Sequence, residues 1–279
     1  MSAREGGAPF EPFFLSAEQG ERFCVFHPPL GDVLGTVVYL HPFAEEMNKS
    51  RRMAALQSRA LAARGFAVLQ IDLFGCGDSS GEFGEAGWDI WKGDVALAVR
   101  WLSGRVTGPL YLWGLRLGAL LALDYAKDAG QSVAGFLLWQ PLASGEQFMT
   151  QFLRLRVANE MISAGTTSVS TQDLRKQLEA SGTLEVAGYD LASAMVSALD
   201  RLKLINLAPR APAYWLELVP EAGRPLPPAS RRVADAWLAQ EVKLTTRTVV
   251  GDAFWNCVEI VDCPGLIEET IRVLGEAHK

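Results

Sequence analysis

The feature of this sequence that most constrains its fold is a pair of glycines, Gly114 and Gly118, with an apolar run on either side. The run Pro109 to Trp113 is typical of a short buried strand, and Leu117 to Lys127 is typical of an apolar helix. Glycine at both positions indicates a strand-to-helix turn so sharp that a Cβ atom would meet neighbouring backbone. The residue at the middle of this turn is Arg116.

Strand and helix patterns alternate on both sides of this turn, which predicts a doubly wound, mostly parallel α/β sheet with right-handed crossovers. The expected strands are Pro12–Ala17, Arg22–His27, Gly35–Leu40, Phe66–Asp72, Pro109–Trp113, Val133–Trp139, Pro212–Val219 and Thr245–Val250, and the expected helices are Ser50–Arg64, Trp91–Leu102, Leu117–Lys127, Ala229–Gln240 and Pro264–Leu274. Residues 144–207 have a mostly helical period and no convincing strand. We therefore expect a core of residues 1–143 and 208–279 and a helical lid insertion of residues 144–207.

Composition excludes several classes of protein. The chain has 279 residues, of which 49% are hydrophobic and 21% charged, as in a globular protein with a large core. Its formal net charge of −6 and its lack of a basic cluster argue against binding nucleic acid. Met1 to Phe14 lacks a signal-peptide-like apolar run, and Leu110 to Tyr125 is too short to span a bilayer. We therefore expect a cytoplasmic protein without a membrane span.

The four cysteines, at positions 24, 76, 257 and 263, show no disulfide framework and no C-x-x-C metal spacing. We expect them to be reduced and structural, as is usual for cysteines of cytoplasmic proteins. The sequence indicates no metal site and no cofactor.

Three loops that follow predicted strands carry the candidate site. The first is His41-Pro42-Phe43-Ala44, the second is Asp72 to Gly81 with the spacing D-x-x-G-x-G-x-S-x-G, and the third is Gly114 to Gly118. In this order they resemble the oxyanion loop, the turn after the fourth strand and the G-x-S-x-G nucleophile elbow of the α/β hydrolases. The resemblance implies an α/β-hydrolase fold whose elbow carries Arg116 in place of serine.

The string His41 to Arg51, taken with the other two loops, resembles a more specific group. This group is the second of the two α/β hydrolases associated with bacterial exosortase A systems, which serve PEP-CTERM sorting and exopolysaccharide export. The resemblance covers essentially the whole chain and implies partners among the components of such a system. It says little about a substrate, because one fold supports many functions.

Hydrolysis by a Ser-His-Asp triad is not expected from these residues. Arginine stays protonated at neutral pH, so Arg116 cannot act as the nucleophile. Residues 251–259, in the loop where the base should follow the last strand, contain no histidine. The position of the acid offers Glu221 at best, and Asp252 is a carboxylate in the wrong loop.

The three histidines of the chain all lie elsewhere. His27 ends an early strand, where we expect an exposed or capping residue. His41 belongs to the oxyanion loop, where histidine is usually structural. His278 is the penultimate residue, and we expect it to belong to a frayed tail.

Two interpretations of Arg116 follow. In the first, Arg116 binds the head group of a small anionic or acyl ligand in the former active-site cleft, because the N-terminus of the next helix and the oxyanion-loop backbone also favour an anion. The residues expected to bind this ligand are Arg116, Leu117, Phe43, Ala44, His41 and Glu45. In the second, an internal carboxylate pairs with Arg116 and fills the cleft, since a buried arginine without a partner is costly. The candidate carboxylates are Glu45, Glu46, Asp72 and Asp78.

Two other functions are alternatives. The chain could be an ester or thioester hydrolase with a displaced nucleophile, for which Cys76, Ser79 and Ser144 are the candidates. It could also be a scaffold for protein interactions. An exposed patch of Trp88, Trp91 and Trp255 would favour that function, because interfaces are enriched in large aromatic side chains.

Overall fold

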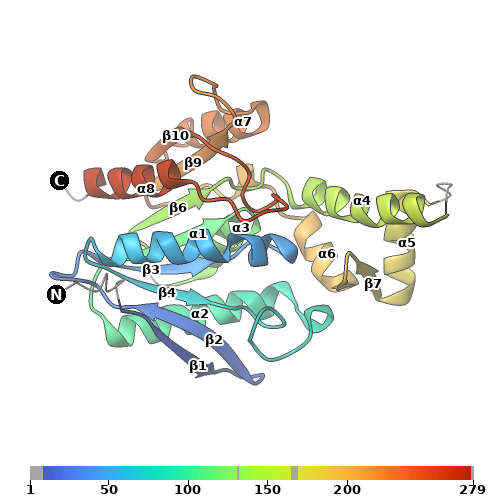
Figure 1. Ribbon diagram of the computed structural model, residues 1–279, viewed down its shortest axis with the longest axis horizontal. Helices are drawn as coiled ribbons and strands as arrows, with labels where there is room; N and C mark the ends of the chain where they lie inside the picture. Colours follow the sequence, from blue (N-terminus) through green and yellow to red (C-terminus); the bar gives the residue numbers. More distant parts are fainter. Residues whose placement is uncertain (1–8, 131, 165–168, 278–279) are drawn as a thin grey trace, which may run out of the picture.

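The centre of the fold is an eight-stranded sheet, which the computed structural model shows within the described residues 9–130, 132–164 and 169–277 (Figure 1). Its strands are β1 (Glu11–Ser16), β2 (Glu21–His27), β3 (Gly35–Leu40), β4 (Phe66–Ile71), β5 (Leu110–Leu115), β6 (Gly135–Trp139), β9 (Ala213–Val219) and β10 (Leu244–Val250). They are ordered β1-β2-β4-β3-β5-β6-β9-β10. Within this sheet the six neighbouring strands β4, β3, β5, β6, β9 and β10 run parallel. At one edge β2 pairs antiparallel with β4, and β1 pairs antiparallel with β2. The predicted doubly wound, mostly parallel sheet is therefore confirmed.

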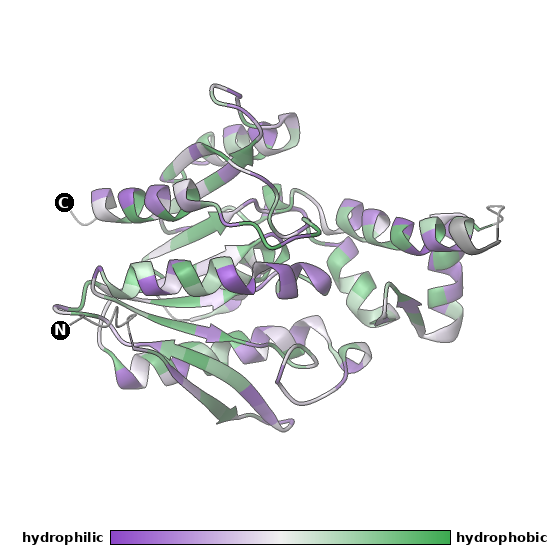
Figure 2. Cartoon of the chain, in the orientation of Figure 1, coloured by the Kyte–Doolittle hydropathy of each residue, from purple (hydrophilic) through white to green (hydrophobic). Residues whose placement is uncertain are grey.

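Helices cover both faces of this sheet. They are α1 (Glu45–Ala62), α2 (Trp88–Arg105), α3 (Leu117–Asp128), α7 (Pro228–Leu238) and α8 (Pro264–Ala277), with a short 3-10 turn η1 (Phe83–Glu85) before α2. Helices α1 and α8 pack on one face, and α2, α3 and α7 pack on the other. Along β3 the side chains alternate between the two cores, so that Val37 faces α1 and Val38 faces α2 and α3. The central strands are accordingly largely apolar, and hydrophilic residues lie mostly on the helices, the loops and the edge strands around them (Figure 2).

Helix α1 begins at Glu45, five residues before the predicted start at Ser50. The sequence pattern misses its first turn because the residues from Glu45 to Lys49 are mostly polar. Two of them, Glu45 and Glu46, are acidic residues in the first turn, where the positive end of the helix dipole favours a carboxylate. This earlier start brings Glu46 to the carboxyl edge of the sheet.

The insertion between β6 and β9 is only partly as predicted. It contains the helices α4 (Gly145–Ala164), α5 (Thr171–Ser181) and α6 (Ser193–Asp200), the 3-10 turn η2 (Leu204–Asn206) and a hairpin of β7 (Thr183–Val186) and β8 (Tyr189–Ala192). The prediction of no strand here was wrong. Ala187 and Gly188 both have positive φ, as the tight turn of a two-residue hairpin requires, and four-residue strands are too short to show a clear period. The insertion begins at the carboxyl edge of the sheet and projects away from it (Figure 1).

None of the helices in the described part of the chain is both long enough and apolar enough to span a bilayer.

His27 is buried, although we expected an exposed or capping residue. It ends β2 beside β4, and its Nε2 lies 3.2 Å from Nε2 of Gln70, while its Nδ1 has no partner among the described residues. Burial, helped by the nearby charge of Arg59, lowers the pKa of His27 to about 4. The imidazole is therefore neutral in the folded protein at neutral pH.

This burial predicts that the protein loses stability in mild acid. A histidine in the unfolded chain has a pKa near 6.5 and is therefore protonated below that pH. His27 in the folded protein stays neutral down to about pH 4, so between these two pH values protonation stabilises the unfolded chain. The free energy of unfolding should fall by about 2 kcal/mol between pH 7 and pH 5 from this residue. Urea unfolding of His27→Gln should show a correspondingly flatter pH dependence, and an unchanged slope would contradict the assignment.

Candidate functional site

The turn between β5 and α3 has the geometry that the two glycines predict. A Cβ on Gly118 would overlap the carbonyl oxygen of Leu40, and a Cβ on Gly114 would overlap the backbone of Gly118. Between them Arg116 adopts φ 55° and ψ −112°, a region that residues with a side chain rarely occupy. Its N–H donates to the carbonyl of Trp139 at 2.9 Å. The turn therefore holds the Arg116 side chain at the carboxyl edge of the sheet, directly before α3.

Arg116 forms an ion pair with Glu46 of α1. Its Nη2 lies 2.9 Å from Oε1, and its Nε lies 3.2 Å from both carboxylate oxygens of Glu46. Each of the two side chains keeps only 18% of its surface exposed. Burial raises the pKa of Glu46, and the charge of Arg116 opposes that rise. The guanidinium thus has the internal carboxylate partner that one of the two interpretations requires.

The other three carboxylates named as candidate partners have different contacts. Glu45 accepts a hydrogen bond from the Tyr189 hydroxyl at 3.2 Å. Asp72 accepts two hydrogen bonds from Arg51, at 2.8 and 3.2 Å. Asp72 Oδ2 also accepts from the backbone N–H of Asp78 at 3.2 Å. Glu46 is the one of the four that pairs with Arg116 in the described structure.

Two aromatic rings enclose the Arg116 guanidinium. Its central carbon lies 5.2 Å from the ring centre of Trp255 and 5.9 Å from that of Phe148, within the range of cation–π contacts. Trp255 comes from the loop after β10, where the α/β hydrolases keep their catalytic histidine. Phe148 comes from α4 of the insertion. The loop after β10 and the insertion therefore both contribute to packing Arg116.

The residues predicted to line a ligand cleft around Arg116 are instead closely packed. Phe43 contacts the rings of Phe83, Trp91, Phe148 and Phe152 edge to face, and only 1% of it is exposed. Ala44, Leu117 and His41 are also buried. Arg116 lines none of the five main cavities of the described chain. Of the predicted ligand-binding residues, Glu45 alone is exposed.

His41 supports the chain locally. Its Nδ1 donates to the carbonyl of Pro42 at 2.7 Å, and its Nε2 accepts from the N–H of Leu73 at 3.2 Å. Both ring nitrogens are thereby occupied in the neutral form, and burial lowers the pKa of the ring. The position of His278 lies outside the described residues.

The two carboxylates considered for the triad acid do not face the elbow site. Glu221 is exposed and pairs with Arg224 at 2.8 Å, and Asp252 is exposed in the final loop. A buried carboxylate that sequence reasoning missed, Glu217, lies within β9. It accepts hydrogen bonds from Trp215 at 2.6 Å, and from Ser230 and Gln140 as well.

Glu217 is held in place by this network and is not free to serve a base. Burial raises its pKa, and the charge of Arg116 contributes a smaller opposing effect. Gln140 follows β6 and, like Arg116, has positive φ, so its amide is fixed between Glu217 and the N–H of Leu218. A glutamate inside a predicted strand gives no sequence signal for this arrangement, because two of its three partners, Gln140 after β6 and Ser230 of α7, are distant in the chain.

The candidate displaced nucleophiles have structural contacts. Ser79 donates to the carbonyl of Asp72 at 2.6 Å and accepts from the N–H of Phe23. Ser144 precedes α4 and accepts from the N–H of Gln147 at 3.3 Å. Cys76 is buried, and burial raises the pKa of its thiol, which disfavours the nucleophilic thiolate.

The three tryptophans named for an exposed interaction patch, Trp88, Trp91 and Trp255, are all buried. The described residues also contain no group of three or more His, Cys, Asp or Glu side chains placed to hold a metal ion.

Comparison with known proteins shows an α/β-hydrolase fold. The chain is similar to Est1E from Butyrivibrio proteoclasticus, whose structure holds ferulic acid, with 15% identity over 95% of this chain and 98% of the other and a TM-score of 0.67. It is also similar to a thermostable carboxyl esterase from Bacillus coagulans, with 14% identity over 97% and 99% and a TM-score of 0.68. At such identities the likeness concerns the fold.

Residues 31–190, more than half of the chain, match the family described as serine aminopeptidase, S33. The chain therefore belongs to this family of α/β hydrolases. It is also similar to human Protein ABHD12B, with 34% identity over 131 residues. That match covers 45% of this chain and 34% of the length of ABHD12B.

The Arg116–Glu46 pair predicts a large and non-additive effect on stability. Removing either partner leaves the other charge largely buried, so Arg116→Met and Glu46→Gln should each lower the free energy of unfolding by about 2–3 kcal/mol. The free energy of unfolding of the double variant should be no lower than that of the less stable single variant, because the double variant leaves no buried charge without a partner. Urea unfolding measures all three.

The exposed pair Arg224 and Glu221 offers a matched control, since Arg224→Met and Glu221→Gln remove an ion pair of similar length from the surface. These control variants should leave stability nearly unchanged. Additive losses in the double variant of Arg116 and Glu46 would mean that the pair contributes no coupling.

Proposed function

We propose that this chain is a non-hydrolytic member of its family, which acts by binding and not by cleaving ester or peptide bonds. The observation that carries this proposal is the ion pair of Arg116 with Glu46 at the place of the catalytic nucleophile. Acyl transfer needs a nucleophile and a base within hydrogen-bond reach. The elbow carries the permanently charged Arg116, and the loop after the last strand places the ring of Trp255 against its guanidinium.

We propose the second interpretation of Arg116, in which it closes the former active site. A ligand anion at Arg116 would have to displace Glu46 and part Arg116 from the rings of Trp255 and Phe148. It would also have to enter among buried side chains such as Phe43. The anionic or acyl ligand expected from the sequence therefore has little support at this position.

We further propose that residues 144–207 act as a lid held shut over this site. Phe148 of α4 contacts the Arg116 guanidinium, and Tyr189 of β8 donates its hydroxyl to Glu45 of α1. Tyr189 also lies edge to face with the ring of Phe83, 5.0 Å away. These three contacts attach two separate parts of the insertion, α4 and β8, to the core.

As the setting of this function, we propose a bacterial exosortase A and exopolysaccharide system. The support is the string His41 to Arg51, to which the structure adds a physical role. Glu46 within it pairs with the elbow, and Arg51 pairs with Asp72 of the second loop. The string His41 to Arg51 therefore contains the first motif loop and forms ion pairs with the other two. The partners of the chain would be other components of that system.

Absence of ester hydrolysis is the first prediction of this proposal. The purified protein should hydrolyse p-nitrophenyl acetate and p-nitrophenyl octanoate no faster than buffer does. Arg116→Ser should gain no activity, because the restored hydroxyl has no base. A carboxyl esterase assayed in parallel shows that the conditions support turnover.

The alternative, a hydrolase with a displaced nucleophile, draws support from the family that the chain belongs to. It predicts turnover by the wild type that Cys76→Ala, Ser79→Ala or Ser144→Ala abolishes. Such a loss, with the variant still folded by circular dichroism, would refute the non-hydrolytic proposal.

The exosortase setting predicts a particular gene neighbourhood. In the source genome, the gene for this chain should lie in one cluster with an exosortase gene and with genes of exopolysaccharide synthesis. A genome that carries this gene without any exosortase would contradict the proposed setting while leaving the non-hydrolytic proposal intact.

A further inference from the structure

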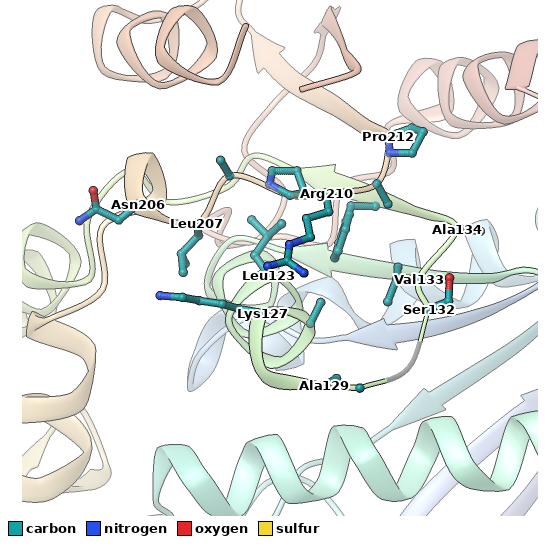
Figure 3. Close-up of a pocket in the computed structure, with 16 residues that line it drawn as sticks. Leu123, Lys127, Ala129, Ser132, Val133, Ala134, Asn206, Leu207, Arg210 and Pro212 are labelled. Atoms are coloured by element: carbon teal, nitrogen blue, oxygen red, sulfur yellow. The ribbon is translucent and has the colours of Figure 1, made fainter. Parts of the chain in front are cut away.

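A cavity of about 740 Å³ lies along the second half of α3, at the opposite edge of the sheet from the end of β5 (Figure 3). One wall is formed by residues of α3 from Leu123 onwards together with Ala129, Gly130 and residues 132–134, and the other is the segment 206–212 that leads into β9. Its volume is within the range of small-molecule sites, about 300–1,000 Å³. Helix α3 is about 18 Å long, with Arg116 before its first residue and Lys127 in its last turn. The cavity is thus separate from the former active site.

Two cations line this cavity, and the described residues of its lining include no aspartate or glutamate. Arg210 extends from the 206–212 segment toward Leu123, and Lys127 extends from α3 in the direction of Leu207 (Figure 3). Neither side chain has an ion-pair or hydrogen-bond partner among the described residues. Asp124 and Asp128 of α3 both pair with Lys92 of α2, and the charge of Lys127 makes a smaller contribution to lowering the pKa of Asp128. The cavity is therefore positively charged at neutral pH.

The rest of the lining is largely apolar and is held by a restrained backbone. Leu123, Phe136 and Leu207 of the wall are almost fully buried, and the half-buried Ala126, Val133 and Ala211 supply its exposed apolar surface. Pro209 and Pro212 stand on either side of Arg210, and the carbonyl of Pro212 accepts the N–H of Phe136 at 2.9 Å. Fixed φ angles and this hydrogen bond limit the motion of the segment, so little backbone freedom is lost when the arginine binds a ligand.

We propose that this cavity binds an amphiphilic organic anion, a carboxylate or phosphate head group on a short apolar chain. The guanidinium of Arg210 receives the anionic head through paired N–H donors, a geometry that suits both carboxylate and phosphate. Lys127 adds a second positive charge at the rim. The apolar part of the ligand packs on the half-buried alanine and valine side chains of the wall. The proposal goes beyond the non-hydrolytic function and does not depend on it.

Calorimetric titration of the whole chain with octanoate, octyl phosphate, octyl glucoside and inorganic phosphate tests this site. Octanoate or octyl phosphate should bind, and which of the two binds more tightly identifies the head group. Octyl glucoside and inorganic phosphate should bind at least tenfold more weakly, because each lacks one of the two recognised parts. Failure of both amphiphilic anions to bind at millimolar concentration would overturn the proposal.

Variants locate the binding within the molecule. Arg210→Gln should weaken binding about tenfold or more, the usual effect of losing a charge-assisted hydrogen bond, and Lys127→Gln should weaken it by a smaller factor. Ala126→Phe introduces a ring at the cavity wall and should block the apolar chain. Arg231→Gln is the matched control, since Arg231 lines a different hollow beside α7. Equal losses in Arg231→Gln and Arg210→Gln, or no loss in Arg210→Gln and Ala126→Phe, would refute this site.

Discussion

Two ion pairs at the carboxyl edge of the sheet hold together the loops that define this protein. Arg116 of the strand-to-helix turn pairs with Glu46, and Asp72 of the glycine-rich loop pairs with Arg51. Glu46 and Arg51 lie five residues apart on α1, and helix α1 therefore contacts both loops at once. Helix α1 thereby links the strand-to-helix turn and the glycine-rich loop at this edge.

Burying the charges of Arg116 and Glu46 costs free energy, so the pair needs good geometry and close packing around it. Two charges lose solvation when they are buried, and their attraction repays that loss only when the geometry is good. The structure meets this condition with three N–O distances of 2.9–3.2 Å and with aromatic rings of Phe148 and Trp255 around the guanidinium. The backbone strain of Arg116, at φ 55°, persists because glycines on both sides admit the sharp turn. The middle position of the strand-to-helix turn thus combines a strained backbone with a paired cation.

Helix α3 connects two differently charged environments. At its N-terminus the cation Arg116 is neutralised by Glu46, whereas near its C-terminus Lys127 and Arg210 face a cavity without a carboxylate in its described lining. The carboxylates of α3 itself are turned toward Lys92 on α2. A cation with a partner fixes structure, and a cation without one remains available to an anion. This difference separates the neutralised elbow from the cavity at the opposite edge of the sheet.

The sequence by itself determined the order of the strands and helices, the two-glycine turn and the absence of a serine and a histidine from their usual positions. These features depend on local periodicity and on single residue types, which are visible in the chain. The hairpin of β7 and β8, the burial of His27 and the network around Glu217 were decided by tertiary structure. Tertiary structure also decided which of the four candidate carboxylates pairs with Arg116. Asp72 is nearer than Glu46 to Arg116 in the chain, yet Asp72 pairs with Arg51 and Glu46 pairs with Arg116. Which groups meet in space depends on the register and packing of distant elements, and neither is encoded in the spacing of residues along the chain.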